Sequence, residues 1–132
     1  MARVLVDTSA VYALVDRSDS NHAAARAILA SLRKRRGEPL LTNFIVAEAH
    51  ALLLSRLGAG IAREWLTRSR WPVERVNEDD EVRARSVIVQ YTDKTFSYTD
   101  AASFAVMERR GLRTAFAFDP RFRQYGFALL EP

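Results

Sequence analysis

The sequence has no cysteine, and only two of its 20 basic residues are lysines, Lys34 and Lys94. The absence of cysteine excludes disulfide bonds and thiolate metal sites, and it is typical of proteins from a reducing compartment. No apolar run is long enough to predict a membrane-spanning helix or the hydrophobic part of a secretion signal. We therefore expect a cytoplasmic protein that does not enter the membrane.

The 132 residues, of which 48% are hydrophobic, fit one domain with a sizeable core. The net charge is +4, and nearly all of the positive charge is arginine. Arginine binds phosphate through a planar fork of donors, so the composition favours a polyanionic partner such as nucleic acid. An arginine-rich, lysine-poor composition also arises in proteins from GC-rich genomes, and the charge alone leaves both interpretations open.

Short apolar runs alternate with segments of helical periodicity along the chain. Strands are predicted at residues 3–6, 39–42, 72–76, 113–118 and 127–130. Helices are predicted at residues 8–15, from the candidate caps Ser20 and Asn21 to 34, and at 43–57, 60–70, 77–91 and 97–110. This alternation predicts an α/β fold, a three-layer sandwich in which helices flank a central parallel sheet of four to five strands.

The segment predicted as a helix at 77–91 has a second interpretation. Val82, Ser86 and Val89 fall on one stripe of it, and Arg83 and Arg85 lie off that stripe. The run from Val87 to Val89 would also suit a strand, because three β-branched residues follow one another.

Four acidic residues occur among apolar or small residues: Asp7, Glu48, Asp100 and Asp119. Asp7 and Asp119 each follow a predicted strand, and parallel sheets bind ligands beyond the carboxyl ends of their strands. A buried carboxylate needs a cation or hydrogen-bond donors to offset the cost of removing its charge from water. Mg²⁺ and Mn²⁺ prefer carboxylate oxygens, and phosphodiester hydrolysis uses such ions to activate water.

Each acid also has a purely structural interpretation. Asp7 could cap the helix that follows it, and Ser97 and Asp100 have the spacing of a capping box. Asp119 could cap a helix that begins with proline. Glu48 lies inside a predicted helix, where capping does not apply, so its structural alternative is a buried salt bridge to an arginine.

Four segments resemble, in order, the motifs of the PIN domain family, and especially those of the VapC toxins of bacterial and archaeal toxin–antitoxin pairs. They span residues 6–10, 42–48, 97–103 and 118–122, so the resemblance covers nearly the whole chain. It implies a PIN-like sandwich and an endoribonuclease that depends on Mg²⁺ or Mn²⁺. It also implies an RNA substrate, a VapB-type antitoxin that covers the acidic pocket, and a homodimer.

The resemblance assigns roles to individual residues. Asp7, Glu48, Asp100 and Asp119 become the catalytic and metal-binding acids. Thr8 or Ser9 would orient the first acid or a water, and Thr99 would support Asp100. Independently of the resemblance, Asp93 is a candidate additional acid because it lies in the loop before Ser97. The apolar residues around Trp65, Trp71 and 52–54 are candidate contact surfaces for the partner, and their alternative is packing in the core.

Two other hypotheses remain open at this point. Asp7 could be the nucleophile of a phosphatase-like enzyme, although such enzymes usually have a second acid where this chain has Ser9. The chain could instead be a non-catalytic module that binds RNA or protein through its arginines. A trapped aspartyl-phosphate would support the former, and metal-dependent RNA cleavage would exclude the latter.

Overall fold

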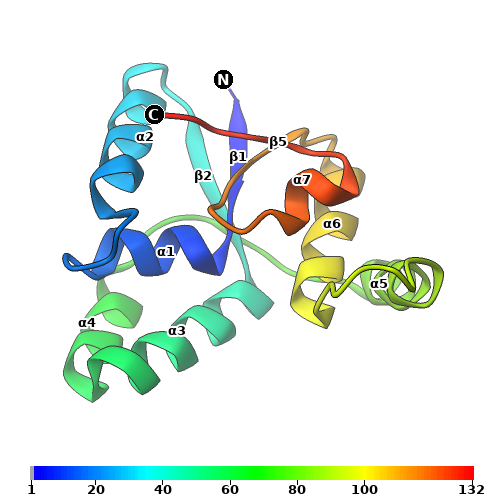
Figure 1. Ribbon diagram of the computed structural model, residues 1–132, viewed down its shortest axis with the longest axis horizontal. Helices are drawn as coiled ribbons and strands as arrows, with labels where there is room; N and C mark the ends of the chain where they lie inside the picture. The colour runs from blue at the N-terminus through cyan, green and yellow to red at the C-terminus, as the bar shows by residue number, and fades with distance from the viewer. Residues whose placement is uncertain (1) are drawn as a thin grey trace.

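A parallel five-stranded sheet lies between two groups of helices in the computed structural model, which describes residues 2–132 (Figure 1). The strands are β1 (Arg3–Val6), β2 (Glu38–Thr42), β3 (Val73–Glu74), β4 (Thr114–Phe116) and β5 (Ala128–Leu129). The helices are α1 (Thr8–Val15), α2 (His22–Lys34), α3 (Asn43–Leu57), α4 (Ala59–Arg68), α5 (Glu78–Gln90), α6 (Tyr98–Arg110) and α7 (Arg121–Tyr125). The predicted α/β architecture is thus confirmed.

The strand order is β3-β2-β1-β4-β5, and every neighbouring pair is parallel. The chain moves outward from β1 to β2 and β3, and then returns to the other side of β1 to form β4 and β5. Because crossovers between parallel strands are right-handed, the reversal puts the two sets of helices on opposite faces. In Figure 1, α1 and α2 accordingly lie on one side of the strands, and α6 and α7 lie on the other.

The core forms where the sheet meets its helices. Leu5 and Phe116, on the adjacent strands β1 and β4, are completely buried. Every residue from 101 to 107 of α6 is buried, because α6 packs against the core on one side and against α5 on another. A helix in this position must be apolar or small-sided nearly all round, and the alanine-rich sequence of α6 meets that need.

Helix α5 packs through a different face from the one that its apolar stripe indicated. Val82 and Val89 are 64% and 76% exposed, whereas Asp80, Ala84 and Val87 are buried. Ala84 is small enough for a close approach of another helix, and the charge of Asp80 is compensated by an arginine of α6. A hydrophobicity pattern counts an acid as exposed even where it is buried with a partner, and for this reason the stripe predicted the wrong buried face of α5.

Most predicted boundaries differ from the observed ones by a few residues, and one predicted cap is wrong. Asn21 occupies the cap position of α2, but its side chain makes no capping hydrogen bond. Asp19 instead accepts a hydrogen bond from the Asn21 backbone N–H at 3.0 Å. In residues 2–132, no helix is both long enough and apolar enough to cross a membrane.

Candidate acidic site at the strand ends

The reversal of strand order places the carboxyl ends of β1 and β4 side by side. Asp7 directly follows β1, and its backbone N–H donates to the carbonyl oxygen of Phe116, the last residue of β4, at 2.9 Å. Asp119 follows β4 by three residues. Open α/β sheets bind ligands at such a topological switch point, because the loops diverge there and leave a crevice.

Asp7 is held in place by Ser9. Its Oδ2 atom accepts hydrogen bonds from the Ser9 hydroxyl at 2.7 Å and from the Ser9 backbone N–H at 3.2 Å, so Asp7 caps α1. The Ser9 hydroxyl oxygen in turn accepts from the Phe118 backbone N–H at 3.0 Å. Ser9 therefore ties the first acid to the segment that carries Asp119.

The carboxyl group of Asp7 titrates far from its ordinary range. Burial raises its pKa from 3.8 to about 6, even though the two hydrogen bonds from Ser9 lower it. The charges of Asp100 and Glu48 raise the pKa further, so both acids lie close enough to repel it. Asp7, at the end of β1, thus shares one negatively charged environment with an acid of α3 and an acid of α6.

Asp100 belongs to this environment and to a capping box at the same time. Its backbone N–H donates to the Ser97 hydroxyl at 3.0 Å, and its Oδ2 accepts from the Ser97 backbone N–H at 2.9 Å. The pKa of Asp100 is nevertheless raised, mainly by burial, and the charge of Asp119 adds to the increase. The capping interpretation and the pocket interpretation of this residue are therefore compatible.

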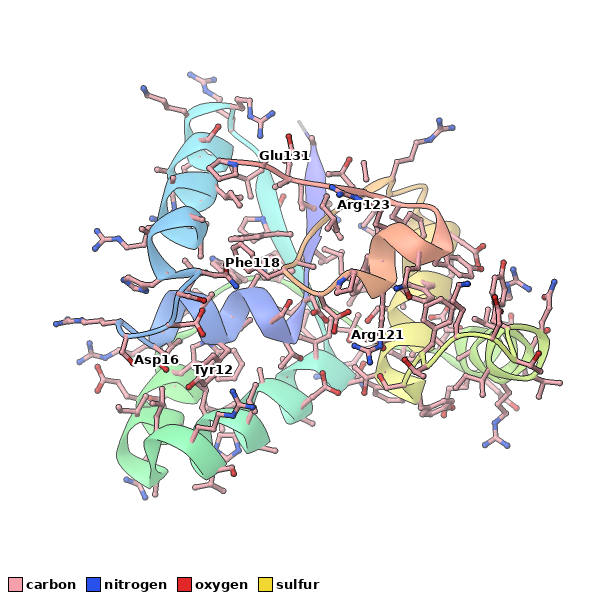
Figure 2. All side chains as sticks on the ribbon, viewed as in Figure 1. Tyr12, Asp16, Phe118, Arg121, Arg123 and Glu131 are labelled. Carbon is pink, nitrogen blue, oxygen red and sulfur yellow. The ribbon has the colours of Figure 1, made fainter. Side chains whose placement is uncertain are left out.

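Arg121 is a site residue that the sequence analysis did not single out. Its Nη1 donates to Asp119 Oδ2 at 2.7 Å, and its Nε lies 3.7 Å from Asp100 Oδ2. The backbone N–H of Arg121 donates to Asp119 Oδ1 at 2.9 Å. Figure 2 shows the side chain at the junction of α6, α7 and the start of α3. The sequence did hold one indication of Arg121: it lies two residues after Asp119, directly after Pro120.

The remaining predicted residues fall into two groups. Thr8 is buried beside Asp7, and its hydroxyl has no hydrogen-bond partner among the described residues. Thr99 is partly buried, and its carbonyl oxygen accepts from the Ser103 hydroxyl inside α6. Asp93 is not part of the cluster: its side chain is 74% exposed and pairs with Lys94 at 2.8 Å, which lowers its pKa.

The donor chemistry of this cluster fits a hard divalent cation. All four acids offer oxygen, two of them are buried, and an unsatisfied hydroxyl lies next to the most buried carboxylate. Within residues 2–132, however, no three acidic or histidine side chains are yet gathered closely enough to coordinate one ion. The Oδ2 atom of Asp100 accepts from the Ser97 backbone N–H, and the Oδ2 atom of Asp119 accepts from Arg121, so one oxygen of each carboxylate is already engaged.

Comparisons with known proteins indicate the family of the chain. A model of the PIN domain family matches residues 4–128. The chain is 33% identical to the 23S rRNA-specific endonuclease VapC20 of Mycobacterium tuberculosis over 98% of both chains. It is 26% identical to the ribonuclease VapC26 of the same species, over 98% of this chain and 93% of the relative.

Solved structures give the same result. The crystal structure of Mycobacterium tuberculosis VapC20, described as a toxin that cleaves the sarcin–ricin loop, is similar with a TM-score of 0.89 at 32% identity and covers 98% of this chain and 99% of its own. FitAcB from Neisseria gonorrhoeae is similar with a TM-score of 0.68 at 22% identity, over 98% and 97% of the two chains, which supports the fold alone.

Proposed function

Because the chain belongs to the PIN domain family, we propose that it is a metal-dependent endoribonuclease of the VapC type, the toxin of a toxin–antitoxin pair that acts in the cytoplasm. The observation that carries the proposal is the grouping of buried carboxylates at the β1–β4 switch point. Neither the phosphatase hypothesis nor the non-catalytic one accounts for acids of separate segments whose charges raise the pKa of Asp7 and of Asp100.

In this proposal Asp7, Glu48, Asp100 and Asp119 hold Mg²⁺ or Mn²⁺. A bound ion of this kind lowers the pKa of water and neutralises charge on the attacked phosphate. Ser9 keeps the carboxylate of Asp7 directed into the pocket through its two hydrogen bonds. The same bonds favour the ionised form of Asp7, which is the form that binds a cation.

We also propose a role for Thr8, which lies beside Asp7. Its hydroxyl is buried and lacks a hydrogen-bond partner among residues 2–132, which is costly in a protein interior. A water molecule or a phosphate oxygen that enters the pocket would satisfy this hydroxyl. Thr8 would then position that oxygen next to Asp7.

The substrate to test first is 23S rRNA, because the relative VapC20 is a 23S rRNA-specific endonuclease. Purified protein should cut this RNA with Mg²⁺ or Mn²⁺ and stop when a chelator is added. Asp7→Asn keeps the shape of the side chain and removes one charge from the metal site, so cleavage should fall by orders of magnitude. Cleavage that persists both in chelator and in the variant would refute the four-acid mechanism.

Besides the acidic site that the antitoxin is expected to cover, the protein offers a docking groove whose lining does not include the four acids. A groove of about 960 Å³ lies between α1, α2 and the α3–α4 hairpin, and Trp65 and Trp71 line it with several aliphatic residues. Five arginines also line it, against only two acids, Asp16 and Glu64. A helix with one apolar face and acidic residues along its edges fits this surface, and we propose that the antitoxin offers one.

Growth and binding assays test the partner role. Expression of the protein alone should inhibit growth, and co-expression of the adjacent reading frame should relieve the inhibition. Arg26→Glu and Arg33→Glu should each weaken antitoxin binding while leaving RNA cleavage by the free protein unchanged, because both residues line the groove and neither contacts an acid of the site. Normal growth with soluble protein present would count against the toxin role.

A further inference from the structure

The side chain of Arg121 is a cation fixed inside the acidic site. Besides its contacts with Asp119 and Asp100, its Nε donates to the carbonyl oxygen of Thr95 at 3.0 Å, and its Nη2 donates to the Thr95 hydroxyl at 3.3 Å. Two segments from different parts of the chain therefore hold the guanidinium. The side chain remains 35% exposed, so it is anchored without being sealed from solvent.

The guanidinium retains unused donors in this position. An arginine side chain has five N–H groups. One each on Nε, Nη1 and Nη2 is engaged by Thr95 and Asp119. One N–H on each Nη nitrogen consequently has no partner among residues 2–132, and both nitrogens are bonded to the same carbon of the planar group.

A free pair of donors at this place matches a phosphate. Two parallel N–H groups bind two oxygens of one phosphate, and arginine offers them at a fixed spacing that lysine does not have. An RNA strand that approaches four carboxylates is also repelled by them, so a fixed positive charge beside the acids lowers the electrostatic cost of binding.

We propose that Arg121 binds a phosphate group of the RNA at the acidic site, and that Thr95 and Asp119 position it for this purpose. The inference rests on the proposed ribonuclease function and assigns it a substrate-binding residue. Asp119 then has two functions, because it binds the divalent cation and also orients the arginine.

The same short helix provides a matched control. Arg123 lies two residues further along α7, and its side chain is 63% exposed. Its ion pair with Glu131 is loose, with 3.9 Å between Arg123 Nη2 and Glu131 Oε1. Figure 2 labels both arginines, and they point to different sides of the helix. Arg121→Gln and Arg123→Gln remove the same charge from the same element, so a difference between them reports on position and not on net charge.

The experiment measures binding of a short fluorescent single-stranded RNA in chelator, at several salt concentrations, by anisotropy. Arg121→Gln should weaken binding roughly tenfold or more, as expected for the loss of hydrogen bonds to a charged group. It should also reduce the slope of log affinity against log salt by about 0.7, because one phosphate contact is lost. Arg123→Gln should leave affinity within about twofold of the wild type, and Arg121→Lys, which keeps the charge and loses the fork, should lie between them.

Calorimetry with Mn²⁺ alone separates this role from a merely structural one. Arg121→Gln removes a competing cation from Asp119, so Mn²⁺ affinity should be unchanged or higher while RNA affinity falls. RNA binding that weakens equally in Arg121→Gln and Arg123→Gln would overturn the inference. If Arg121→Gln fails to fold, the test uses Arg121→Lys, and binding as tight as that of the wild type would then overturn it. The two proposals can fail separately. If RNA binding depends on Arg121 as predicted but the wild-type protein never cuts RNA, only the ribonuclease proposal is refuted.

Discussion

Asp7→Asn should stabilise the metal-free protein at neutral pH, although it should destroy its activity. Asp7 is buried, and its pKa is raised from 3.8 to about 6. That difference corresponds to roughly 3 kcal/mol, by which the ionised carboxylate disfavours the folded state once the pH is well above 6. The stability contributed by the protonated group is fully present below pH 3.8 and is lost as the pH rises through about 6.

The substitution also weakens two hydrogen bonds. The Ser9 hydroxyl and backbone N–H donate to a charged oxygen in the wild type and would donate to a neutral amide oxygen in the variant. The pKa of about 6 already includes this weakening, because both bonds favour the ionised form and lower the pKa, so nothing further is subtracted for them. The net gain at neutral pH is then about 3 kcal/mol, which for a domain of this size is a rise in Tm of several degrees or more.

Melting curves in chelator at about pH 4 and about pH 7.5 test this reasoning, because the gain should shrink or vanish at the lower pH. Added Mn²⁺ should raise the Tm of the wild type and leave that of the variant nearly unchanged. A gain of equal size at both pH values, or a loss at pH 7.5, would refute the account.

Asp16→Asn is the control for this prediction. Asp16 lies at the other end of α1, and its pKa is lowered, chiefly because the Tyr12 hydroxyl donates to it at 2.6 Å. Its ionised form therefore favours the folded state, and that contribution is lost as the pH falls. Asp16→Asn should lower the Tm slightly at pH 7.5 and leave it unchanged in acid, which is the opposite of the pattern for Asp7.

Four further substitutions test individual features. Thr8→Val removes a buried hydroxyl without a partner, so the metal-free Tm should hold or rise while the rate of RNA cleavage falls. Arg109→Ala removes the partner of the buried Asp80 and should cost about 3 kcal/mol in urea unfolding. Gly37→Ala would place its Cβ against the side chain of the buried Leu32 in α2 and should cost about 1–3 kcal/mol. Gly60→Ala in α4, where a Cβ meets nothing within 4 Å, should instead stabilise by about 0.5–1 kcal/mol.

The helices and strands were predictable because their periodicity is local. The helix over 43–57 is observed with the same bounds, since Thr42 caps it and Gly58, with a positive φ of 93°, ends it. The short edge strand β3 was predicted too long, because only Val73 and Glu74 pair with β2. Pairing partners are a property of the assembled sheet, so the length of an edge strand cannot be read from its own residues.

The electrostatics of the site could be predicted only in part. The acids stood out because carboxylates among apolar residues are unusual. Arg121 did not stand out, because it is one of many arginines and its neighbour Asp100 is distant in sequence. The pairing of Asp80 with Arg109 could not be predicted for the same reason, since the two residues are distant in sequence. Without that pair, the buried face of α5 could not be predicted either.

Capping a helix and binding a metal are compatible roles for the acids of this site. In the proposed metal site, carboxylates repel one another before a metal binds, and a local source of positive potential reduces that cost. Asp7 and Asp100 obtain it at the first turns of α1 and α6, where backbone N–H groups and the helix dipole favour a negative charge. Asp119 obtains it from the backbone N–H and the guanidinium of Arg121. A capping pattern in the sequence is therefore no argument against a catalytic acid, since helix starts are where a fold can hold such acids with their charges partly offset.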